Sequence, residues 1–408
     1  MREMGFGPVD PKNGWAHGPD VLVDLTPLDT PSRFRGIGRY AAGLAQGIAE
    51  LAAEGGLELR VEALVRNGLG SGPLTDPALC YSGDPRLRPS HWQYSKYKMV
   101  RRLTMGTLAA STGARLLHLT DPNGTPWDCR VPRIITCHDL IPLILHKQYM
   151  GSFPGARFVR WLRDVVRFRS AVRLIAISEA TRRDVIGLLG LHPARIDVIK
   201  HGVDHERFCN RNAAGESEQV KAALNVHDPF LLSVGGGDPR KRLDLLIRAF
   251  AQSGRARDVQ LVIAGALTSH QRRALAGEAE AAGVSSRVVL AGFVDEGLMP
   301  ALYRTCLGHV FPSIYEGFGL TVLEAMSCGT PTITTLTTSL AEVAGNASLT
   351  VPADDQEALS AAIRKLVDDS NLQQELSVRG RAWALQFTWR QCALQTVACY
   401  RRALEEIG

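Results

Sequence analysis

The hydrophobic positions of this chain follow two alternating periods. Short runs of apolar and β-branched residues predict buried strands, at residues 21–25, 59–65, 116–119, 133–137, 174–177, 196–199, 230–234, 260–264, 288–291, 309–311 and 332–335. Apolar residues three or four positions apart predict helices, at residues 40–53, 158–169, 243–251, 270–282, 298–304, 320–329, 356–368, 371–384 and 389–406. Ser178 predicts the N-cap of a further helix that begins at Glu179. Strands that alternate with helices predict parallel sheets with helices on both faces.

The 408 residues divide into two halves of this kind. A chain of this length exceeds a single domain of about 100–200 residues. Residues 1–19 are rich in Gly, Pro and polar groups and predict a loose tail, while the polar stretch 205–227 predicts a linker with a short helix. We therefore expect two Rossmann-like, doubly wound α/β domains at 20–204 and 205–385, which face each other across a cleft.

Composition narrows the class of protein. Apolar residues make up 45% of the chain and charged residues 22%, as in ordinary globular proteins. We expect no membrane-spanning helix, because no apolar run approaches about 18 residues, and no signal peptide, because the N-terminus lacks an apolar segment. The eight cysteines include no C-x-x-C pair, which argues against a zinc site or a disulfide framework. This usage favours a reducing cytoplasm.

The stretch 310–335 is the strongest candidate for the functional site. A strand ends at Phe311, the loop E-G-F-G follows at 316–319, and a helix begins at Leu320. Glycine lets the backbone approach a ligand closely, and a helix N-terminus attracts anions. Glu316 and Glu324 would frame this anion site. The alternative is that both acids are solvated, as most surface acids are, but the glycines between them favour a binding site.

A second anion site is predicted at Arg240 and Lys241. These cations follow strand 230–234 and the glycines 235–237, and they open the next helix. Such a pair suits a departing diphosphate, although an exposed basic pair is the simpler alternative. A dinucleotide-binding dehydrogenase is excluded, because Arg240 stands where a third small residue is needed. A P-loop is excluded because G-x-x-x-x-G-K-[ST] does not occur.

Two features of the first half are candidates for the opposite wall of the cleft. Gly36 and Gly38 form a glycine loop before helix 40–53, which either approaches a ligand or makes a tight turn. His138 stands at the carboxyl end of strand 133–137, which favours a cleft position over a buried structural histidine.

Basic residues are concentrated in the first half. The net charge is +6, and Lys and Arg cluster at 86–102 and 157–173. Helix 158–169 is amphipathic, so it either presents a solvated basic face or lies on an anionic membrane. In the second case its apolar side consists of Phe158, Trp161, Leu162, Val165 and Val166.

These motifs resemble one known enzyme family, in sequence and in order. P-S-I-Y-E-G-F-G-L-T-V-L-E-A-M-S-C-G-T-P resembles the Glu-x7-Glu signature of the family-four retaining glycosyltransferases, which have the GT-B fold. G-I-G-R-Y, T-C-H-D-L-I-P-L, H-G-V-D and V-G-G-G-D-P-R-K-R-L resemble further motifs of this family. The resemblance covers nearly all the chain from Val21 onward. It also implies that residues 386–408 cross back onto the first domain.

The resemblance implies a role for each matching residue. Lys241 would contact the diphosphate of a nucleotide-sugar donor, Glu324 the ribose hydroxyls, and Glu316 the transferred sugar. His138 would contact that sugar near the reaction centre. Other donor contacts would come from Gly36, Gly38, Gly236, Val294, Phe318, Gly319 and Leu320.

One departure from the family concerns Gly236, where many members carry an arginine. We expect Arg240 to supply that cation. The family needs neither a metal nor another cofactor, and the chain contains no D-x-D motif to bind a metal. Cations and helix dipoles would then stabilise the leaving diphosphate. Its phosphate oxygen would take the acceptor proton, and the anomeric configuration would be retained.

The resemblance therefore predicts a hexosyltransferase. GDP-mannose is favoured as the donor and a UDP-sugar stays open. A glycan or lipid-linked acceptor would place the enzyme in surface polysaccharide or lipopolysaccharide assembly, at the inner face of the membrane, with no role for nucleic acid. The alternatives are a GT-B phosphorylase or epimerase, or a non-catalytic subunit that binds nucleotide sugars. The presence of Glu316, Glu324 and Lys241 argues against the last.

Overall fold

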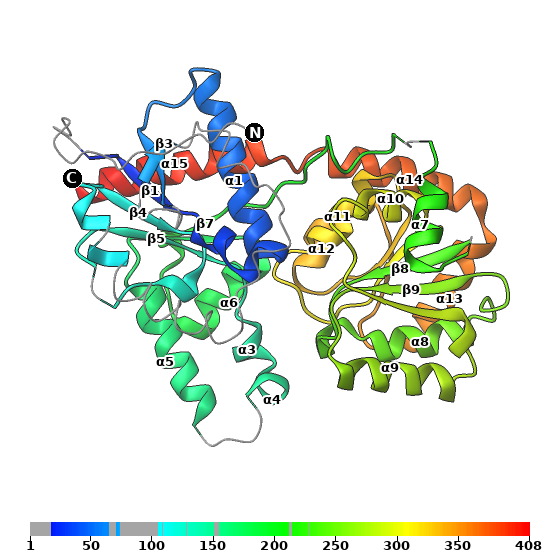
Figure 1. Ribbon diagram of the computed structural model, residues 1–408. Helices are drawn as coiled ribbons and strands as arrows, with labels where there is room; N and C mark the ends of the chain where they lie inside the picture. The colour runs from blue at the N-terminus through cyan, green and yellow to red at the C-terminus, as the bar shows by residue number, and fades with distance from the viewer. Residues whose placement is uncertain are drawn as a thin grey trace.

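Two mainly parallel sheets organise the molecule, as the alternation of strands and helices predicts (Figure 1). The computed structural model describes residues 18–64, 71–73, 105–107, 109–127, 129–150, 155–211, 214–227 and 229–408. Most of the predicted tail at 1–19 and the basic cluster at 86–102 lie outside the described residues. We refer to the part of the chain built around each sheet as the first lobe and the second lobe.

The sheet of the first lobe has seven strands in the order β3-β2-β1-β4-β5-β6-β7. Its strands are β1 (Val21–Asp24), β2 (Val61–Leu64), β3 (Ser71–Pro73), β4 (Leu116–Leu119), β5 (Arg133–Cys137), β6 (Arg173–Ala176) and β7 (Ile196–Val198). Strand β3 is antiparallel to β2, whereas β1, β2 and β4 to β7 run parallel. All four residues of β1 and of β4 are buried, as expected for strands that helices cover on both faces.

The sheet of the second lobe has six strands, all parallel, in the order β10-β9-β8-β11-β12-β13. They are β8 (Phe230–Val234), β9 (Gln260–Ala264), β10 (Val288–Gly292), β11 (Gly308–Phe311), β12 (Thr332–Thr335) and β13 (Leu349–Val351).

Helices connect the strands of each lobe. The first lobe contains α1 (Gly36–Ala53), α3 (Ile141–Ile144), α4 (His146–Tyr149), α5 (Ala156–Arg169), α6 (Glu179–Leu189) and α15 (Trp389–Ile407). The second contains α7 (Glu216–Leu224), α8 (Leu243–Gln252), α9 (Ser269–Ala281), α10 (Met299–Thr305), α11 (Leu320–Ser327), α12 (Thr338–Ala344), α13 (Gln356–Asp368) and α14 (Ser370–Ala384). The sequence analysis did not predict α3, α4 and α12. Helices α3 and α4 have four residues each, which is too few to show a helical period.

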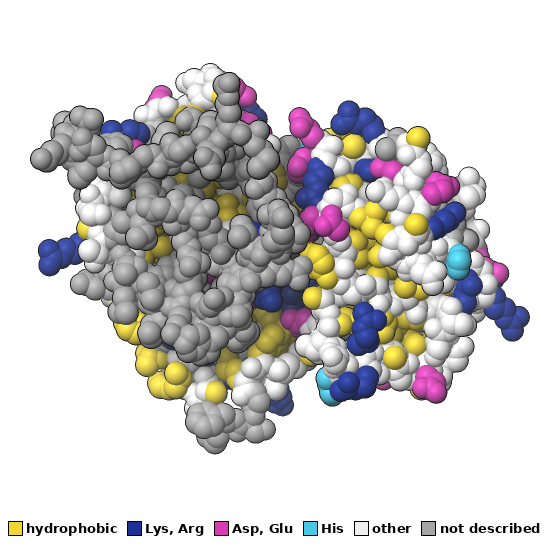
Figure 2. Space-filling view, in the orientation of Figure 1, with side chains coloured by type: hydrophobic (Ala, Val, Ile, Leu, Met, Phe, Trp, Pro, Cys, Tyr) yellow, Lys and Arg dark blue, Asp and Glu magenta, His cyan; other side chains and the backbone are white. Residues whose placement is uncertain are grey.

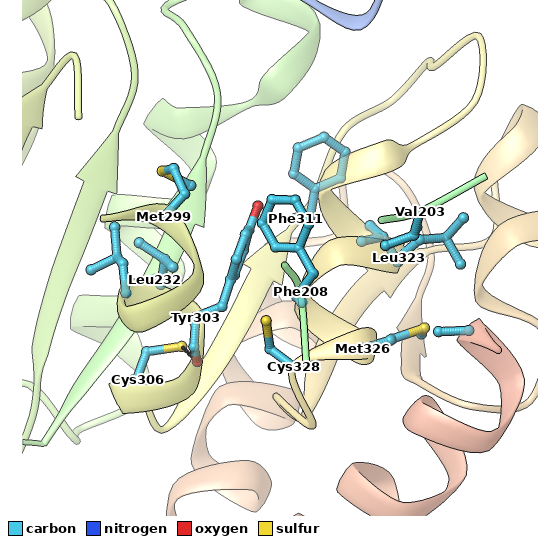
Figure 3. Close-up of a cluster of buried hydrophobic side chains, with 14 of the residues drawn as sticks. Val203, Phe208, Leu232, Met299, Tyr303, Cys306, Phe311, Leu323, Met326 and Cys328 are labelled. Atoms are coloured by element: carbon cyan, nitrogen blue, oxygen red, sulfur yellow. Dashed lines mark hydrogen bonds between the residues drawn. The ribbon is translucent and has the colours of Figure 1, made fainter. Parts of the chain in front are cut away.

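Each sheet is covered on both faces, so each lobe has two hydrophobic cores. In the second lobe, α8, α9 and α13 cover one face, and α10, α11 and α14 cover the other (Figure 1). Figure 3 shows the second of these cores, in which Tyr303 of α10, Phe311 of β11 and Met326 of α11 lie together. Burial of one large apolar side chain stabilises by about 1.5–3 kcal/mol. The loops at the strand ends are therefore anchored by well-packed hydrophobic cores.

Helix α15 comes from the end of the chain but packs on α1 of the first lobe (Figure 1). A Cβ atom at Gly43 of α1 would lie 2.1 Å from ring atoms of Trp389, so glycine is needed for this close approach. Val203 pairs with Thr388 in an isolated bridge beside this contact. The chain therefore passes between the lobes twice, and the two crossings lie side by side at Val203 and Thr388.

The strand order gives each sheet a topological switch point. The chain order reverses between β1 and β4 in the first sheet, and between β8 and β11 in the second. In doubly wound sheets, ligands bind beyond the carboxyl ends of the strands at such points. The predicted pair of doubly wound domains that face each other is confirmed. Within the described residues, no helix has the length and apolar character needed to span a bilayer.

Candidate active site

The loop after β11 is fixed by hydrogen bonds from both lobes. Ser339 Oγ donates to the carbonyl oxygens of Glu316 (2.8 Å) and Phe318 (2.9 Å). From the first lobe, Ser178 Oγ donates to the carbonyl oxygen of Gly317 (2.9 Å). A Cβ at Gly317 would lie 2.1 Å from the carbonyl oxygen of His138, so glycine is required where the lobes touch. The next glycine, Gly319, has φ of 111° and leads directly into α11.

Glu316 is buried and paired with two cations of its own lobe. Its Oε1 lies 2.6 Å from Lys241 Nζ, and its Oε2 lies 2.5 Å from Arg240 Nη1. Burial opposes ionisation, but Lys241 and Arg240 lower the pKa of Glu316 to about 2. Burial in turn lowers the pKa of Lys241, against the attraction of Glu316. The three groups together carry a charge of +1, which the carboxylate of Asp238, 3.4 Å from Arg240 Nε, balances.

Arg240 and Lys241 do not open α8 as predicted. They lie in a 3-10 turn at Pro239–Lys241, whose N-cap Asp238 accepts from the backbone N–H of Arg240 (3.2 Å). Arg242 has φ of 52° and separates this turn from α8. The turn directs Lys241 Nζ over the ring of Phe311, 4.2 Å from the ring centroid, at the switch point of the second sheet.

Glu324 is also buried, but its partners come from both lobes. It is the fifth residue of α11, and Tyr303 Oη donates to its Oε2 (3.2 Å). Its Oε1 accepts a hydrogen bond from Nη1 of Arg39, in the first turn of α1. Burial raises the pKa of Glu324, and Arg39 opposes this shift only in part. The carboxylate is thus held across the cleft by a cation that the sequence did not single out.

His138 lies at the end of β5, where its ring is packed between aromatic groups. The ring centroids of Tyr40 and His201 lie 5.2 Å and 5.8 Å away. Its Nε2 lies 2.7 Å from the carbonyl oxygen of Thr120, and a carbonyl only accepts, so this nitrogen carries the proton. Burial lowers the pKa of His138. The ring is therefore neutral near pH 7, and its Nδ1 is an acceptor.

The predicted glycine loop at Gly36 and Gly38 is instead the first turn of α1, which begins at Gly36. A Cβ at Gly38 would lie 2.2 Å from Cα of Arg33, so this glycine lets the preceding turn pack on the helix. The first turn of a helix tolerates glycine, since its N–H groups have no intrahelical partners. Gly38 still lines the cleft, as described below.

The other predicted donor residues fall in different surroundings. Gly236 follows β8, and a Cβ there would lie 3.1 Å from the carbonyl oxygen of Ala266. Val294 and Phe318 are buried in the hydrophobic core of the second lobe, with the Phe318 ring 4.9 Å from that of His201. Leu320 is partly exposed at the start of α11.

A pocket of about 290 Å³ brings some of these residues together in the cleft. Of the predicted site residues, its lining includes Gly38, Leu320 and Glu324. It does not include Glu316, Arg240, Lys241, His138 or Val294. Figure 2 shows acidic and basic side chains gathered along the boundary between the lobes. The structure therefore divides the predicted residues into a Glu316 cluster and a Glu324 pocket, both at the same interlobe boundary.

Several residues of this boundary were missed by the sequence analysis. Glu296 Oε1 lies 2.9 Å from Arg39 Nη2, and its Oε2 lies 2.9 Å from Arg207 Nη2. Farther along the cleft, the hydroxyl groups of Tyr149 and Tyr315 donate to Asp238 and Asp184, which lie in the opposite lobe. A signal existed for Arg39 alone, because a charged residue inside G-I-G-R-Y is unusual for a helix start chosen only for packing.

The basic helix α5 presents apolar side chains outward. Phe158, Val159, Leu162 and Val166 are exposed, whereas Val165 is buried rather than part of the predicted apolar side. Figure 2 shows hydrophobic side chains gathered over this helix at the edge of the first lobe. Beside it, Leu143, Gly155, Arg157, Phe158, Trp161, Gly187 and Leu188 line a pocket of about 510 Å³.

Two family models match the chain, one on each lobe. The model described as Glycosyltransferase Family 4 matches residues 34–207, and the model described as Glycosyl transferases group 1 matches residues 216–383. Among the described residues, no group of three or more His, Cys, Asp or Glu side chains is placed to hold a metal ion.

Individual relatives and structures agree with these matches. The serotype-specific mannosyltransferase WbdA of Escherichia coli is 25% identical over 411 residues, which cover 94% of this chain and 48% of WbdA. The O-antigen chain mannosyltransferase B of Escherichia coli is 30% identical over 235 residues, 57% of this chain and 61% of the relative. The chain thus spans about half of these relatives' length.

A solved structure extends the comparison to the fold. Sucrose-phosphate synthase from Thermosynechococcus elongatus superposes with a TM-score of 0.71 at 23% identity, over 95% of this chain and 99% of that one. This likeness, together with the two doubly wound sheets, confirms the predicted GT-B fold.

Proposed function

The chain belongs to the glycosyltransferases that the group 1 and family 4 models describe, and from this premise we propose that it transfers a hexose from a nucleotide-diphosphate sugar. The observation that carries the proposal is the Glu316 cluster, in which Arg240 and Lys241 lie at the switch point of the second sheet. Two cations at this place suit a diphosphate.

The proposed reaction keeps the anomeric configuration. The bond between the sugar C1 and the diphosphate oxygen breaks, and the acceptor hydroxyl forms the new bond to C1 on the same face. Its proton passes to the departing phosphate oxygen, so no side-chain base is needed. Lys241 and Arg240 stabilise the charge that develops on the diphosphate. Glu316, beside them, orients the sugar, and the unprotonated Nδ1 of His138 accepts a hydrogen bond from a sugar hydroxyl.

The donor is assigned from the relatives and from the Glu324 pocket. Glu324 offers a carboxylate of the kind that binds the two hydroxyls of a ribose. Mannose is the favoured sugar, because two relatives are named mannosyltransferases. GDP-mannose is therefore the proposed donor, ahead of a UDP-sugar. The charge of the leaving group is matched by protein cations, and we expect transfer to persist in the presence of a chelator such as EDTA.

The acceptor is proposed to be a glycan or a lipid-linked sugar of surface polysaccharide assembly. One relative is named for the O-antigen chain. Helix α5 supports a contact with anionic membrane, because exposed Phe158, Leu162 and Val166 adjoin the arginines of the same helix. Flotation with anionic vesicles at low salt should carry the protein upward. If the protein does not float with anionic vesicles, or floats equally well with neutral vesicles, this part of the proposal is wrong.

Donor turnover tests the function as a whole. The purified protein is incubated with GDP-mannose, GDP-fucose, UDP-glucose, UDP-galactose or UDP-N-acetylglucosamine, with and without a lipid-linked acceptor, and release of the nucleoside diphosphate is measured. We expect release with GDP-mannose above the other donors. Phosphate-dependent release of a sugar phosphate would indicate a phosphorylase, and conversion of the sugar without release would indicate an epimerase. Binding without turnover would indicate a non-catalytic subunit.

A further inference from the structure

Arg39 is hydrogen-bonded to the carboxylate of Glu324, which the proposed function gives the role of binding the ribose. Its Nη1 donates to Glu324 Oε1, and Tyr303 Oη donates to Glu324 Oε2 at 3.2 Å. Both oxygens of Glu324 are therefore engaged within the protein. A carboxylate has about four acceptor positions, and Arg39 lines the same pocket as Glu324, so a ribose diol that enters this pocket competes with Arg39 for the carboxylate.

Of the two partners, Arg39 is the one that can leave. Tyr303 is fully buried in the core of the second lobe, where Figure 3 shows it among apolar side chains. Moving it would open a cavity in the packed core, which is destabilising. The side chain of Arg39 is 23% exposed and lines the Glu324 pocket. It reaches Glu324 from the other lobe, so it can withdraw without disturbing a core.

The pocket that Arg39 lines is small. Its volume is about 290 Å³, at the lower limit of the range of about 300–1,000 Å³ typical of small-molecule sites. Arg39, Glu296 and Glu324 all line it. Glu296 holds Arg39 at 2.9 Å and Arg207 at 2.9 Å, so an Arg39 released from Glu324 would stay at the pocket rim.

The charges of the cleft indicate where Arg39 goes. Lys241 and Arg240 are both paired with Glu316, and Arg240 also lies 3.4 Å from Asp238. These four groups leave no net positive charge for a diphosphate that carries about two negative charges. Arg39 stands in the first turn of α1, beside Gly38, where the N-terminus of an 18-residue helix adds positive potential. The guanidinium also matches two phosphate oxygens at once.

We propose that Arg39 exchanges Glu324 for the diphosphate of the donor when the donor binds. The exchange deepens the proposed function and rests on it. Ribose hydroxyls take the place of Arg39 on Glu324, and the freed guanidinium becomes a diphosphate ligand from the first lobe. One residue thereby makes ribose recognition and diphosphate recognition conditional on each other.

Nucleosides and nucleoside diphosphates distinguish this exchange from a structural role. Dissociation constants are measured by calorimetry for guanosine and GDP, and for uridine and UDP, with the wild-type protein and with Arg39→Met. We expect Arg39→Met to weaken the diphosphate by about tenfold or more, the effect of losing a charge-assisted hydrogen bond. The same variant should tighten the matching nucleoside by about threefold or more, because Glu324 no longer has to release a partner.

Controls within the chain make the result specific. Arg207→Met removes a cation that contacts Glu296 but not Glu324, and it should not tighten the nucleoside. Arg39→Met should not increase the affinity for a 2′,3′-dideoxynucleoside. In a double variant that also carries Glu324→Gln, the affinity for the nucleoside should not increase either. If thermal unfolding shows that Arg39→Met is poorly folded, Arg39→Lys, which keeps the charge, takes its place. It should show the same two opposite changes in the dissociation constants, with smaller magnitude.

The outcomes separate this inference from the proposed function. The exchange alone is overturned if the wild-type protein binds GDP or UDP but the Arg39 variants do not show opposite changes. That is the case if Arg39→Met and Arg39→Lys shift the dissociation constants for nucleoside and diphosphate in the same direction, or leave the constant for the nucleoside unchanged. A wild-type protein that binds none of the nucleotides overturns the proposed function and the exchange together. Opposite shifts confined to the Arg39 variants support the exchange.

Discussion

Glu316 and Glu324 belong to one motif, eight residues apart, yet different parts of the molecule neutralise them. Glu316 pairs with Lys241 and Arg240, which follow the neighbouring strand of its own sheet. Glu324 depends on Arg39, a residue of the other lobe. The two acids are similarly buried, and burial raises the pKa of each. For Glu316 the cations Lys241 and Arg240 outweigh burial and lower the pKa, whereas for Glu324 burial prevails and the pKa is raised.

This difference indicates that one part of the site is complete within a lobe and the other part depends on how the lobes meet. The ion pairs of the Glu316 cluster join residues of the second lobe alone, which follow the adjacent strands β8 and β11. The Glu324 pocket changes whenever α1 moves relative to α11. Variants on the two sides should therefore affect different kinetic constants.

The largest effect is expected from the Glu316 cluster. Lys241→Met removes a cation from the leaving diphosphate and should lower kcat for donor turnover by about 10²–10³-fold, as loss of one preorganised charge-stabilising group does in other enzymes. The matched control is Arg242→Met, because Arg242 is the next residue and pairs with Asp244 and Asp354 on the surface. Equal kcat values for the two variants would contradict the role of Lys241.

A smaller effect on a different constant is expected from Glu324. Glu324→Gln keeps the shape but weakens the hydrogen bonds to the ribose, so KM for the donor should rise by about tenfold, while kcat changes less. Steady-state kinetics with GDP-mannose measure both constants. Glu375→Gln on α14, which breaks a surface pair with Arg379, is the control. A fall in kcat with constant KM would place Glu324 at the reacting sugar instead.

The two acids should also affect folding stability with opposite dependence on pH. Glu316 has its pKa lowered from 4.5 to about 2, so its stabilising contribution is present above pH 4.5 and is lost as pH falls toward 2. Glu324 has a raised pKa, so its contribution is complete below pH 4.5 and is lost as pH rises through the folded-state value.

Urea unfolding between about pH 2 and pH 8 measures these contributions. Glu316→Gln should reduce the loss of stability as pH falls below 4.5. Glu324→Gln should reduce the loss of stability as pH rises above 4.5. Profiles of both variants that run parallel to the wild type would contradict the opposite environments of the two carboxylates.

The smallest effect is expected from the exposed end of the cleft. Tyr149→Phe removes the hydroxyl that donates to Asp238 across the lobes. A single exposed hydrogen bond contributes about 0.5–1.5 kcal/mol, so kcat/KM for the donor should fall by no more than about tenfold. A loss as large as that of Lys241→Met would mean that this contact decides whether the lobes close.

The sequence allowed prediction of what each lobe builds from its own strands. The Glu316 loop and the Arg240–Lys241 turn each follow a strand, and parallel order brings the ends of adjacent strands together. The pairing of Arg39 with Glu324 could not be predicted in this way, because it depends on how α1 is placed against α11. No local pattern encodes that placement.

Two local features show the same limit at smaller scale. The pattern of glycines predicted a loop at 36–38, but α1 begins at Gly36, because Gly38 must pack against the backbone of Arg33. The predicted helix start at Arg240 became a 3-10 turn, because Arg242 adopts positive φ. In both cases the local periodicity was correct, and a tertiary contact or an unusual backbone angle set the boundary.

The position of α15 has a consequence for biosynthesis. This helix contributes Trp389, Cys392 and Tyr400 to the core around α1, yet it leaves the ribosome after the whole second lobe. The first lobe therefore emerges with a gap in its core, and its nascent form exposes apolar surface while the second lobe can already fold. Domains usually fold in order of synthesis, but here the first lobe completes its core only after α15 has emerged.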